Sequence, residues 1–204
     1  ELEARFGDCT DEGGFSSCVS SRFFYDALHA CEAWTGWGRV DDWSTSVDFY
    51  FEHGGELIRT TRAEDGGVTH LAKTSLARRV FRLEHDDPAP DVPHALRISV
   101  AAEKEKSADE LPSSAFPSKI RDKTRKSFTS AAWRFDFTRV FDGATRADID
   151  AARREGRERF EIELECVGLD MRMSSSDEHI ASSMLMKMTD FLLFSATRCA
   201  VCVV

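Results

Sequence analysis

The segment Arg159–Gly168 reads Arg-Phe-Glu-Ile-Glu-Leu-Glu-Cys-Val-Gly and alternates charged with apolar residues. Successive side chains of a β-strand point to opposite faces of its sheet. One face of this segment is therefore apolar, and the other carries Glu161, Glu163 and Glu165. The apolar face has to be buried against other elements, so the segment predicts one strand of a sheet with a charged side and a covered side.

The same alternation predicts further strands along the chain. They are expected at Glu1–Phe6, Ser46–Phe51, Glu56–Arg62, Thr69–Phe81, Ala95–Glu103, Ser118–Phe128 and Ala132–Phe141. His53-Gly54-Gly55 has the residues of a tight hairpin turn, whereas residues 84–94 and 104–119 have the composition of loops. Strands that follow one another through short connections pair antiparallel, so we expect a large antiparallel sheet.

Three segments have helical periodicity. Residues 20–31 place apolar side chains on one side, and Arg146–Glu155 follows a Thr145/Asp148 capping box and ends before Gly156. A third helix, from Asp177 to about residue 198, carries one apolar stripe, made of Ile180, Met184, Leu185, Met188 and Phe191. The class is α+β: we expect a closed antiparallel β-barrel of about eight strands with packing helices, whose charged faces point into a tunnel.

Composition narrows the classes of protein. The 204 residues, 42% hydrophobic and 31% charged, predict a single domain over residues 1–204. A net charge of −9 disfavours DNA and general nucleic-acid coating, and no apolar run is long enough for a membrane helix. Six scattered cysteines favour a reduced, intracellular setting, and packing is the expected role of Cys199 and Cys202. The histidines lack metal-site spacing.

Charges of one sign gather on single predicted strands. Glu161, Glu163 and Glu165 share one strand, and Arg121, Lys123 and Arg125 share another. Like charges about 7 Å apart repel by roughly 2 kcal/mol at an effective dielectric constant near 20. Each polar face is, on the simplest interpretation, a solvent-exposed face. The segregation by sign instead favours ligands, a divalent cation beside the acids and an anion beside the bases.

These motifs, in this order, resemble the triphosphate tunnel metalloenzymes. The matching features are Glu1-Leu2-Glu3 before a basic residue, the Arg-x-Lys-x-Arg strand, the Asp136-x-Thr138 step and the closing triple glutamate. Within that family the chain most resembles the RNA 5′-triphosphatases of fungal and protozoan mRNA capping. The resemblance spans Glu1 to about Gly168, and the segment after Met171 carries no matching motif.

The resemblance implies roles for individual residues. Glu1, Glu3 and Glu165 would hold Mg²⁺ or Mn²⁺, with Glu163 acting through a water on the metal. Glu103 would position the attacking water. The γ-phosphate would be bound by Arg59, Lys123 and Arg125, with Lys73 as a further member. The residues expected to support these side chains are Arg5, Asp48, Arg121, Asp136, Thr138 and Glu161.

The implied activity is removal of the γ-phosphate from triphosphate-ended RNA, in the nucleus, with a capping guanylyltransferase as a candidate partner. Two alternatives remain: the same barrel acting on tripolyphosphate, thiamine triphosphate or free nucleotides, and a non-catalytic barrel or sheet that binds a polyanion or a partner. Trp34, Trp37 and Trp43 are candidates for stacking on a base at the tunnel mouth, whereas packing is favoured for Trp133. The negative charge predicts that the protein binds the RNA end and little else.

Overall fold

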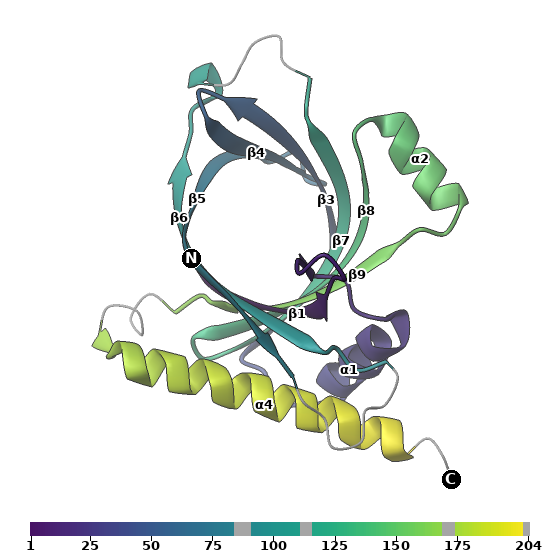
Figure 1. Cartoon of the computed structure of the whole chain (residues 1–204), viewed down its shortest axis with the longest axis vertical. Coiled ribbons are helices and arrows are strands. Elements are labelled where there is room, and N and C mark those ends of the chain that lie inside the picture. The colour runs from purple at the N-terminus through teal and green to yellow at the C-terminus, as the bar shows by residue number, and fades with distance from the viewer. Residues whose placement is uncertain (84–90, 111–115, 169–173, 202–204) are drawn as a thin grey trace.

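Eight antiparallel strands close into a barrel, which confirms the predicted class (Figure 1). The computed structural model describes residues 1–83, 91–110, 116–168 and 174–201, with side chains to residue 193. Around the barrel the strands are β1 (Leu2–Cys9), β6 (Ala95–Glu105), β5 (Val68–Arg82), β4 (Glu56–Ala63), β3 (Arg39–His53), β7 (Lys119–Ser130), β8 (Trp133–Gly143) and β9 (Arg159–Cys166). The short β2 (Phe15–Ser16) pairs with the end of β1.

The first and last strands close the barrel. β1 pairs with β9 so that Glu3 lies opposite Glu165 and Arg5 opposite Glu163. On its other side β1 pairs with β6, where Glu3 lies opposite Ser99. Paired residues point to the same face of a sheet. The closure therefore brings the charged rows of β1 and β9 side by side on the inner face.

Helices bury the apolar outer face of the barrel. In Figure 1 α4 (Asp177–Val201) lies across one side of the barrel with α1 (Ser21–Ala33) beside it, and α2 (Arg146–Arg154) lies near β8. The core between them includes Phe6 of β1, Phe24 of α1, Phe137 of β8 and Met188 of α4. The hydrophobic core is thus outside the barrel wall, between the strands and the helices.

Local signals placed these helices well. Ser20 caps α1 by accepting a hydrogen bond from the backbone of Phe23, and the predicted Thr145/Asp148 capping box is present at the start of α2. The predicted stripe on α4 is correct at Met184, Met188 and Phe191, which are buried. It is wrong at Leu185, which is 53% exposed because the buried stripe of the helix is narrower than the sequence pattern.

Most strands are longer than the sequence predicts, and β3 differs most. β3 begins at Arg39 rather than Ser46, because a bulge between Asp41 and Ser44 interrupts the alternation from which strands are recognised. β6 continues to Glu105 and is followed by the short 3₁₀ helix η1 (Ala108–Glu110), both within the segment 104–119 that was predicted as a loop. Residues 84–90 of the other predicted loop, Cys202 and the side chain of Cys199 lie outside the described residues.

The tryptophans do not line the tunnel. Trp34, Trp37 and Trp133 instead line a separate apolar cavity of about 250 Å³ between α1, α4 and the β7–β8 turn, so the base-stacking hypothesis is wrong for the first two. Trp133 is buried and its Nε1 donates to Ser183 Oγ of α4 at 2.9 Å, which confirms packing beneath a helix. Trp43 is partly exposed on β3 and is not part of the tunnel lining.

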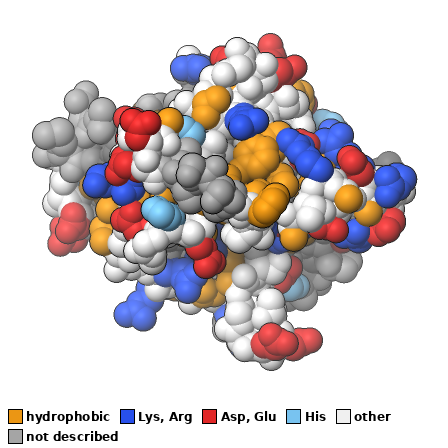
Figure 2. Space-filling model, turned by 90° about the horizontal axis from the view of Figure 1, so that it is seen from above, with side chains coloured by type: hydrophobic (Ala, Val, Ile, Leu, Met, Phe, Trp, Pro, Cys, Tyr) orange, Lys and Arg blue, Asp and Glu red, His pale blue; other side chains and the backbone are white. Residues whose placement is uncertain are grey.

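The surface mixes charges of both signs. On the face shown in Figure 2, lysines and arginines alternate with acids around a central group of hydrophobic side chains. Among the described residues, no helix combines the length and apolar character that a membrane span requires.

Phe137 tests the core outside the barrel wall. Its fully buried ring packs near the rings of Phe24 and Phe128, with centroid distances of 5.5 and 5.7 Å. Phe137→Ala is expected to lower the free energy of unfolding by about 3–5 kcal/mol, measured by urea denaturation. Phe116→Ala, at a side chain that is 94% exposed, is the matched control and is expected to change it by less than about 0.5 kcal/mol. Equal losses in both variants would contradict this core.

Candidate active site: a charged tunnel

A cavity of about 790 Å³ runs inside the barrel and is lined by side chains from all eight strands. Most of the predicted site residues line it: Glu1, Glu3, Arg5, Asp48, Arg59, Lys73, Glu103, Arg121, Lys123, Arg125, Glu163 and Glu165. The other three, Asp136, Thr138 and Glu161, lie behind this lining, where each accepts a hydrogen bond from an arginine of β7. The structure therefore brings all the predicted residues to one site.

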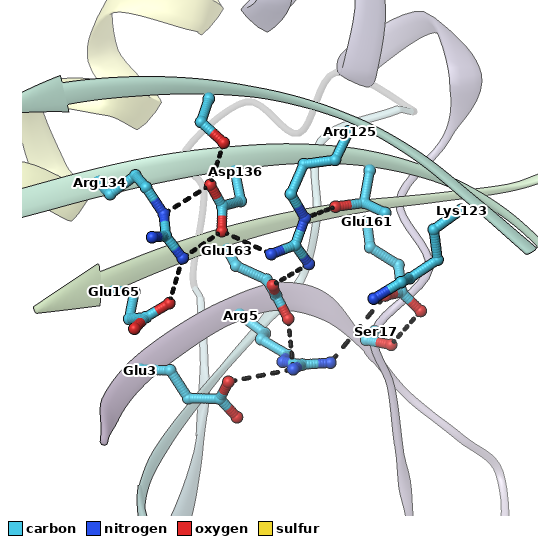
Figure 3. A network of polar contacts seen from close by, with 12 residues as sticks. Glu3, Arg5, Ser17, Lys123, Arg125, Arg134, Asp136, Glu161, Glu163 and Glu165 are labelled. Atoms are coloured by element: carbon cyan, nitrogen blue, oxygen red, sulfur yellow. Dashed lines mark hydrogen bonds and ion pairs between the residues drawn. The ribbon is translucent and has the colours of Figure 1, made fainter. Parts of the chain in front are cut away.

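Arg125 joins three strands (Figure 3). Its Nε donates to Thr138 Oγ1 at 2.9 Å, and its Nη1 donates to Asp136 Oδ2 at 2.8 Å, both on β8. Its Nη2 donates to Glu163 Oε2 of β9 at 3.1 Å. With every edge of the guanidinium held, the plane of Arg125 is fixed in one orientation, with 30% of the side chain still exposed to the tunnel.

Asp136 is the most fully satisfied acid behind the lining. The residue is fully buried, and its carboxylate accepts from Ser127 at 2.6 Å, from Arg125 at 2.8 Å and from two nitrogens of Arg134 at 2.9 and 3.0 Å. Arg134 also donates to Glu165 at 2.6 Å. A buried carboxylate is stable only when it is paired and hydrogen-bonded, and Asp136 is both. It holds two arginines in place from behind.

The β1 side of the tunnel is a second cluster (Figure 3). The Arg5 guanidinium donates to Glu3 Oε2 at 3.0 Å and forms an ion pair with Glu163. Arg5, the basic residue that follows Glu1-Leu2-Glu3, thus contacts carboxylates inside the tunnel. Lys73 of β5 pairs with Glu1, and Arg97 lies 3.6 Å from Glu3.

The third group lies on β3, β4 and β7. Lys123 Nζ is 2.6 Å from Asp48 Oδ2, and Thr61 donates to the other oxygen of that carboxylate at 2.7 Å. Burial lowers the pKa of Lys123, and the cations Arg125 and Arg59 lower it further against the effect of Asp48. Arg59 Nη2 lies 3.5 Å from Glu103 Oε1. The lysine is a poorly solvated cation beside two other cations, so it is a favourable position for an anion.

These contacts add a second explanation for the segregation of charges. The sequence analysis took it to favour bound ligands, and the carboxylates of β1 and β9 also face the arginines of β1, β7 and β8 on nearby strands. Ion pairs between strands offset the repulsion within each strand, even without a ligand. The segregation by sign therefore reflects strand pairing in the closed barrel.

Glu1, Glu3 and Glu165 are the residues that could hold a divalent cation. Glu3 and Glu165 are direct partners across the β1–β9 closure. Burial raises the pKa of Glu165, and Glu1 and Asp136 raise it further against the opposing effect of Arg134. Oxygen donors of this kind fit Mg²⁺ or Mn²⁺. In the described part of the chain, however, no three potential ligands converge as a metal site, because each carboxylate is turned to a base.

Three basic residues of the tunnel were not assigned from the sequence. Arg134 lies two residues before Asp136 on the same face of β8, so the alternation contained the signal. Arg97 was placed on the inner face without a role. Arg78 lines the tunnel only because the register of β5 shifts between Ser75 and Ala77, and the sequence gives no sign of that shift.

The charge network predicts a dependence of stability on pH. Burial alone would raise the pKa of Glu163, but Arg5 and Arg125 hold it down at about 2. A carboxyl with a lower pKa in the folded state stabilises the fold above its unfolded value of about 4.3, and this stabilisation is lost as the pH falls from there toward 2. The melting temperature of the protein is expected to fall over this window, and Glu163→Gln is expected to flatten the fall.

The control for this measurement is Glu155→Gln. Glu155 pairs with Arg157 on the surface, where both side chains are more than half exposed, so this variant is expected to keep the full pH dependence. Thermal scans from neutral pH to about pH 2.5 check the prediction. An undiminished fall in Glu163→Gln would show that this carboxyl is not held ionised by its arginines.

The same fold is present in solved structures of other proteins. The barrel is similar to the S. pombe Pct1 RNA triphosphatase, with a TM-score of 0.67 and 17% identity, covering 94% of this chain and 83% of that chain. For Pct1 in complex with the Spt5 CTD the TM-score is 0.66 and the identity is 16%, covering 94% of this chain and 84% of that chain. For the RNA triphosphatase domain of the mimivirus mRNA capping enzyme the TM-score is 0.64 and the identity is 13%, covering 96% of this chain and 89% of that chain. These likenesses show the tunnel fold.

The family is shown by the sequence itself. No curated protein matches the chain. Residues 88–191 match the family model described as mRNA capping enzyme, beta chain, and this match includes β6, β7, β8, α2 and β9. It covers half of the chain, including the basic strand and the triple glutamate of the tunnel. The chain belongs to the mRNA capping enzyme, beta chain family.

Proposed function

We propose that this protein is a divalent-cation-dependent RNA 5′-triphosphatase, which removes the γ-phosphate of triphosphate-ended RNA as the first step of cap formation. The observation that carries this proposal is the tunnel, in which a row of bases on β7 faces the carboxylates of β1 and β9 inside a closed barrel. Membership of the capping family supports the RNA end as the substrate.

The bases supply electrostatic stabilisation. During phosphoryl transfer, charge spreads over the equatorial oxygens of the transferred group, and fixed cations lower the barrier. Arg125 is oriented by three acceptors before any substrate arrives, and Lys123 is only partly neutralised by Asp48. With Arg59 they form a basic group on β4 and β7, and we assign the γ-phosphate to it. Lys73, paired with Glu1, is a further member.

Glu103 is proposed to act on the water. Its carboxylate lies beside Arg59, at 3.5 Å, and therefore next to the basic group assigned to the γ-phosphate. A water oxygen attacks the γ-phosphorus, the bond from that phosphorus to the bridging β–γ oxygen breaks, and the water proton passes to Glu103. The products are inorganic phosphate and an RNA with a 5′-diphosphate. No covalent bond to the protein is needed.

Glu1, Glu3 and Glu165 are proposed to hold the divalent cation, with Glu163 beside them. When bound, the ion supplies charge neutralisation on the phosphate oxygens and orients the triphosphate. Its entry requires Glu165 to exchange Arg134, and Glu1 to exchange Lys73, for the ion. The binding side chains, among them Arg125, Lys123 and Glu163, are kept in place by the contacts described above. The residues that make these contacts are Asp136, Thr138, Glu161, Arg5, Asp48 and Arg121.

The setting of the reaction is part of the proposal. We propose that the protein acts in the nucleus, where nascent transcripts are capped, and that the capping guanylyltransferase is its partner. The support is membership of the mRNA capping enzyme, beta chain family. In the related Pct1 structure the bound partner is the Spt5 CTD.

The activity is tested by phosphate release from triphosphate-ended RNA, tripolyphosphate and ATP, each with Mg²⁺ or Mn²⁺. RNA is expected to have the highest kcat/KM. Arg125→Ala is expected to lower kcat by about 10²–10³, as for other lost electrostatic donors. Lys119→Ala, at an exposed lysine paired with Asp142 outside the tunnel lining, is the control and is expected to leave kcat unchanged. If no phosphate were released with either ion, a barrel that only binds a polyanion would be favoured. A higher kcat/KM for tripolyphosphate than for RNA would identify tripolyphosphate as the substrate.

The proposed ion is tested by stability. A ligand that binds only the folded barrel stabilises it and so raises its melting temperature. At a ligand concentration of a hundred times the Kd, the stabilisation is about 2.7 kcal/mol. Millimolar Mn²⁺ is expected to give a clear upward shift that Glu165→Gln abolishes. Glu103→Gln is the matched variant: it is expected to keep the shift and to lose hydrolysis. A melting temperature that does not change with Mn²⁺ would contradict the metal site. Loss of the shift in Glu103→Gln would make Glu103 a ligand of the ion.

A further inference from the structure

The wall of the barrel is uneven where β5 extends beyond β4. The pairing of β4 with β5 covers Ile58–Arg62 and Val68–Ala72. β5 continues beside β6 as far as Arg82, which lies opposite Ala95. Beyond Ser75, β5 is therefore an edge strand with β6 as its single described neighbour, and its residues from Leu76 to Arg82 are exposed.

A bulge decides which side chains of this extension face the tunnel. The register with β6 shifts between Ser75 and Ala77, so Leu76 is the extra residue. After it, Arg78 lies opposite Ser99, Val80 opposite Arg97 and Arg82 opposite Ala95. Ser99 and Arg97 line the tunnel, and paired residues share a face.

The alternate residues of the extension point to the other face. Arg79 lies opposite Ile98 and Phe81 opposite Leu96, which belong to the apolar side of β6. The tunnel face of the extension therefore carries Arg78, Val80 and Arg82, and we call these three residues, with Arg97, the β5 ramp.

The ramp is basic and only partly neutralised. Among the described residues, no ion pair or side-chain hydrogen bond involves Arg78 or Arg82, whereas Arg97 lies 3.6 Å from Glu3, and Arg5, Lys123 and Arg125 inside the tunnel are all paired. Burial lowers the pKa of Arg97, and the charges of Arg5 and Arg78 lower it further against the effect of Glu3. Cations that outnumber the acids beside them form a site for anions.

Apolar surface lies beside these charges. Val80 is 44% exposed on the ramp, and Arg97 lies over the ring of Phe15, 5.0 Å from its centroid. Alternation of cations with apolar or aromatic surface is typical of sites that bind single-stranded nucleic acid, where phosphates meet the cations and bases meet the apolar surface. Toward the start of β5, the lining includes Leu71 beside Arg59, and Leu57 of β4.

We propose that the β5 ramp binds the backbone phosphates of single-stranded RNA that follow the triphosphate. This inference rests on the proposed function, because the chain attached to a triphosphate in the tunnel must leave by one mouth. The ramp is continuous with the lining at Arg78, where β5 runs past the end of its pairing with β4. Arg78 and Arg82 are about 13 Å apart along an extended strand, far enough to contact different phosphates. RNA binding on the ramp would extend beyond the triphosphate end, whereas the net charge of −9 predicts binding of the end and little else.

The test compares Arg82→Ala with Arg79→Ala. Both remove one exposed arginine from the same strand, but only Arg82 lies on the tunnel face. The wild-type protein is expected to have a kcat/KM for a long triphosphate-ended transcript more than about tenfold above that for a triphosphate-ended dinucleotide, equivalent to about 1.4 kcal/mol. Arg82→Ala is expected to lose several-fold of this advantage and to leave tripolyphosphate hydrolysis unchanged. Arg79→Ala is expected to keep the advantage.

Direct binding separates this inference from the proposed activity. Anisotropy with a labelled single-stranded RNA bearing a 5′-hydroxyl needs no hydrolysis. Arg82→Ala is expected to weaken this binding and to lower the slope of log K against log salt by about 0.7, the value for one single-strand phosphate contact. Binding that is lost in this variant would support the ramp even if the protein hydrolysed no triphosphate.

Three results would overturn the ramp. They are equal kcat/KM for the dinucleotide and the long transcript, equal losses in Arg79→Ala and Arg82→Ala, and tighter binding of a polyglutamate peptide than of RNA at the same salt concentration. The last result would assign the surface to an acidic protein partner.

Discussion

Attraction between opposite charges on facing strands is the interaction on which this barrel depends. A barrel of this kind has no apolar interior, and its hydrophobic core lies outside the wall, beneath α1 and α4. Buried ion pairs often add little net stability, because desolvation offsets their attraction. In this barrel the ion pairs fix the register in which neighbouring strands pair. A slip of one residue between β1 and β9 would move Glu163 and Glu165 to the apolar face, and it would separate Arg5 from Glu163 and Arg134 from Glu165.

The same pairing prepares the tunnel for phosphate. Arg125 and Arg134 are held from behind by the fully buried Asp136, so their orientation does not have to be established when the substrate binds. Fixed dipoles and charges stabilise a transition state at little cost in reorganisation. The carboxylates in front are different, because Glu1 and Glu165 are held by single bases that a cation can replace. Arg125 and Arg134 are therefore fixed by several contacts, whereas Glu1 and Glu165 can exchange their single basic partners for a cation.

Sequence reasoning succeeded where the alternation was regular. It placed Glu161, Glu163 and Glu165 on one inner face, recognised the barrel and found the capping box at Thr145. It failed at bulges, which shift the alternation by one residue: the first half of β3 was missed, and Arg78 was not assigned. It also could not predict partners, since the contact of Arg5 with Glu163 exists only after β1 meets β9.

The closure between β1 and β9 also constrains how the protein is made. Glu3 and its partner Glu165 are far apart in the sequence, with all the other strands of the barrel between them. Chains emerge from the ribosome at about 5–20 residues per second, so β1 waits many seconds for its second neighbour. Before β9 is made, the sheet is open: β1 lacks one neighbour, and Arg121 and Arg125 lack their partners on β9. Charged side chains along an exposed strand edge disfavour edge-to-edge association of two nascent chains, so the residues that equip the mature tunnel also protect its unfinished form from aggregation.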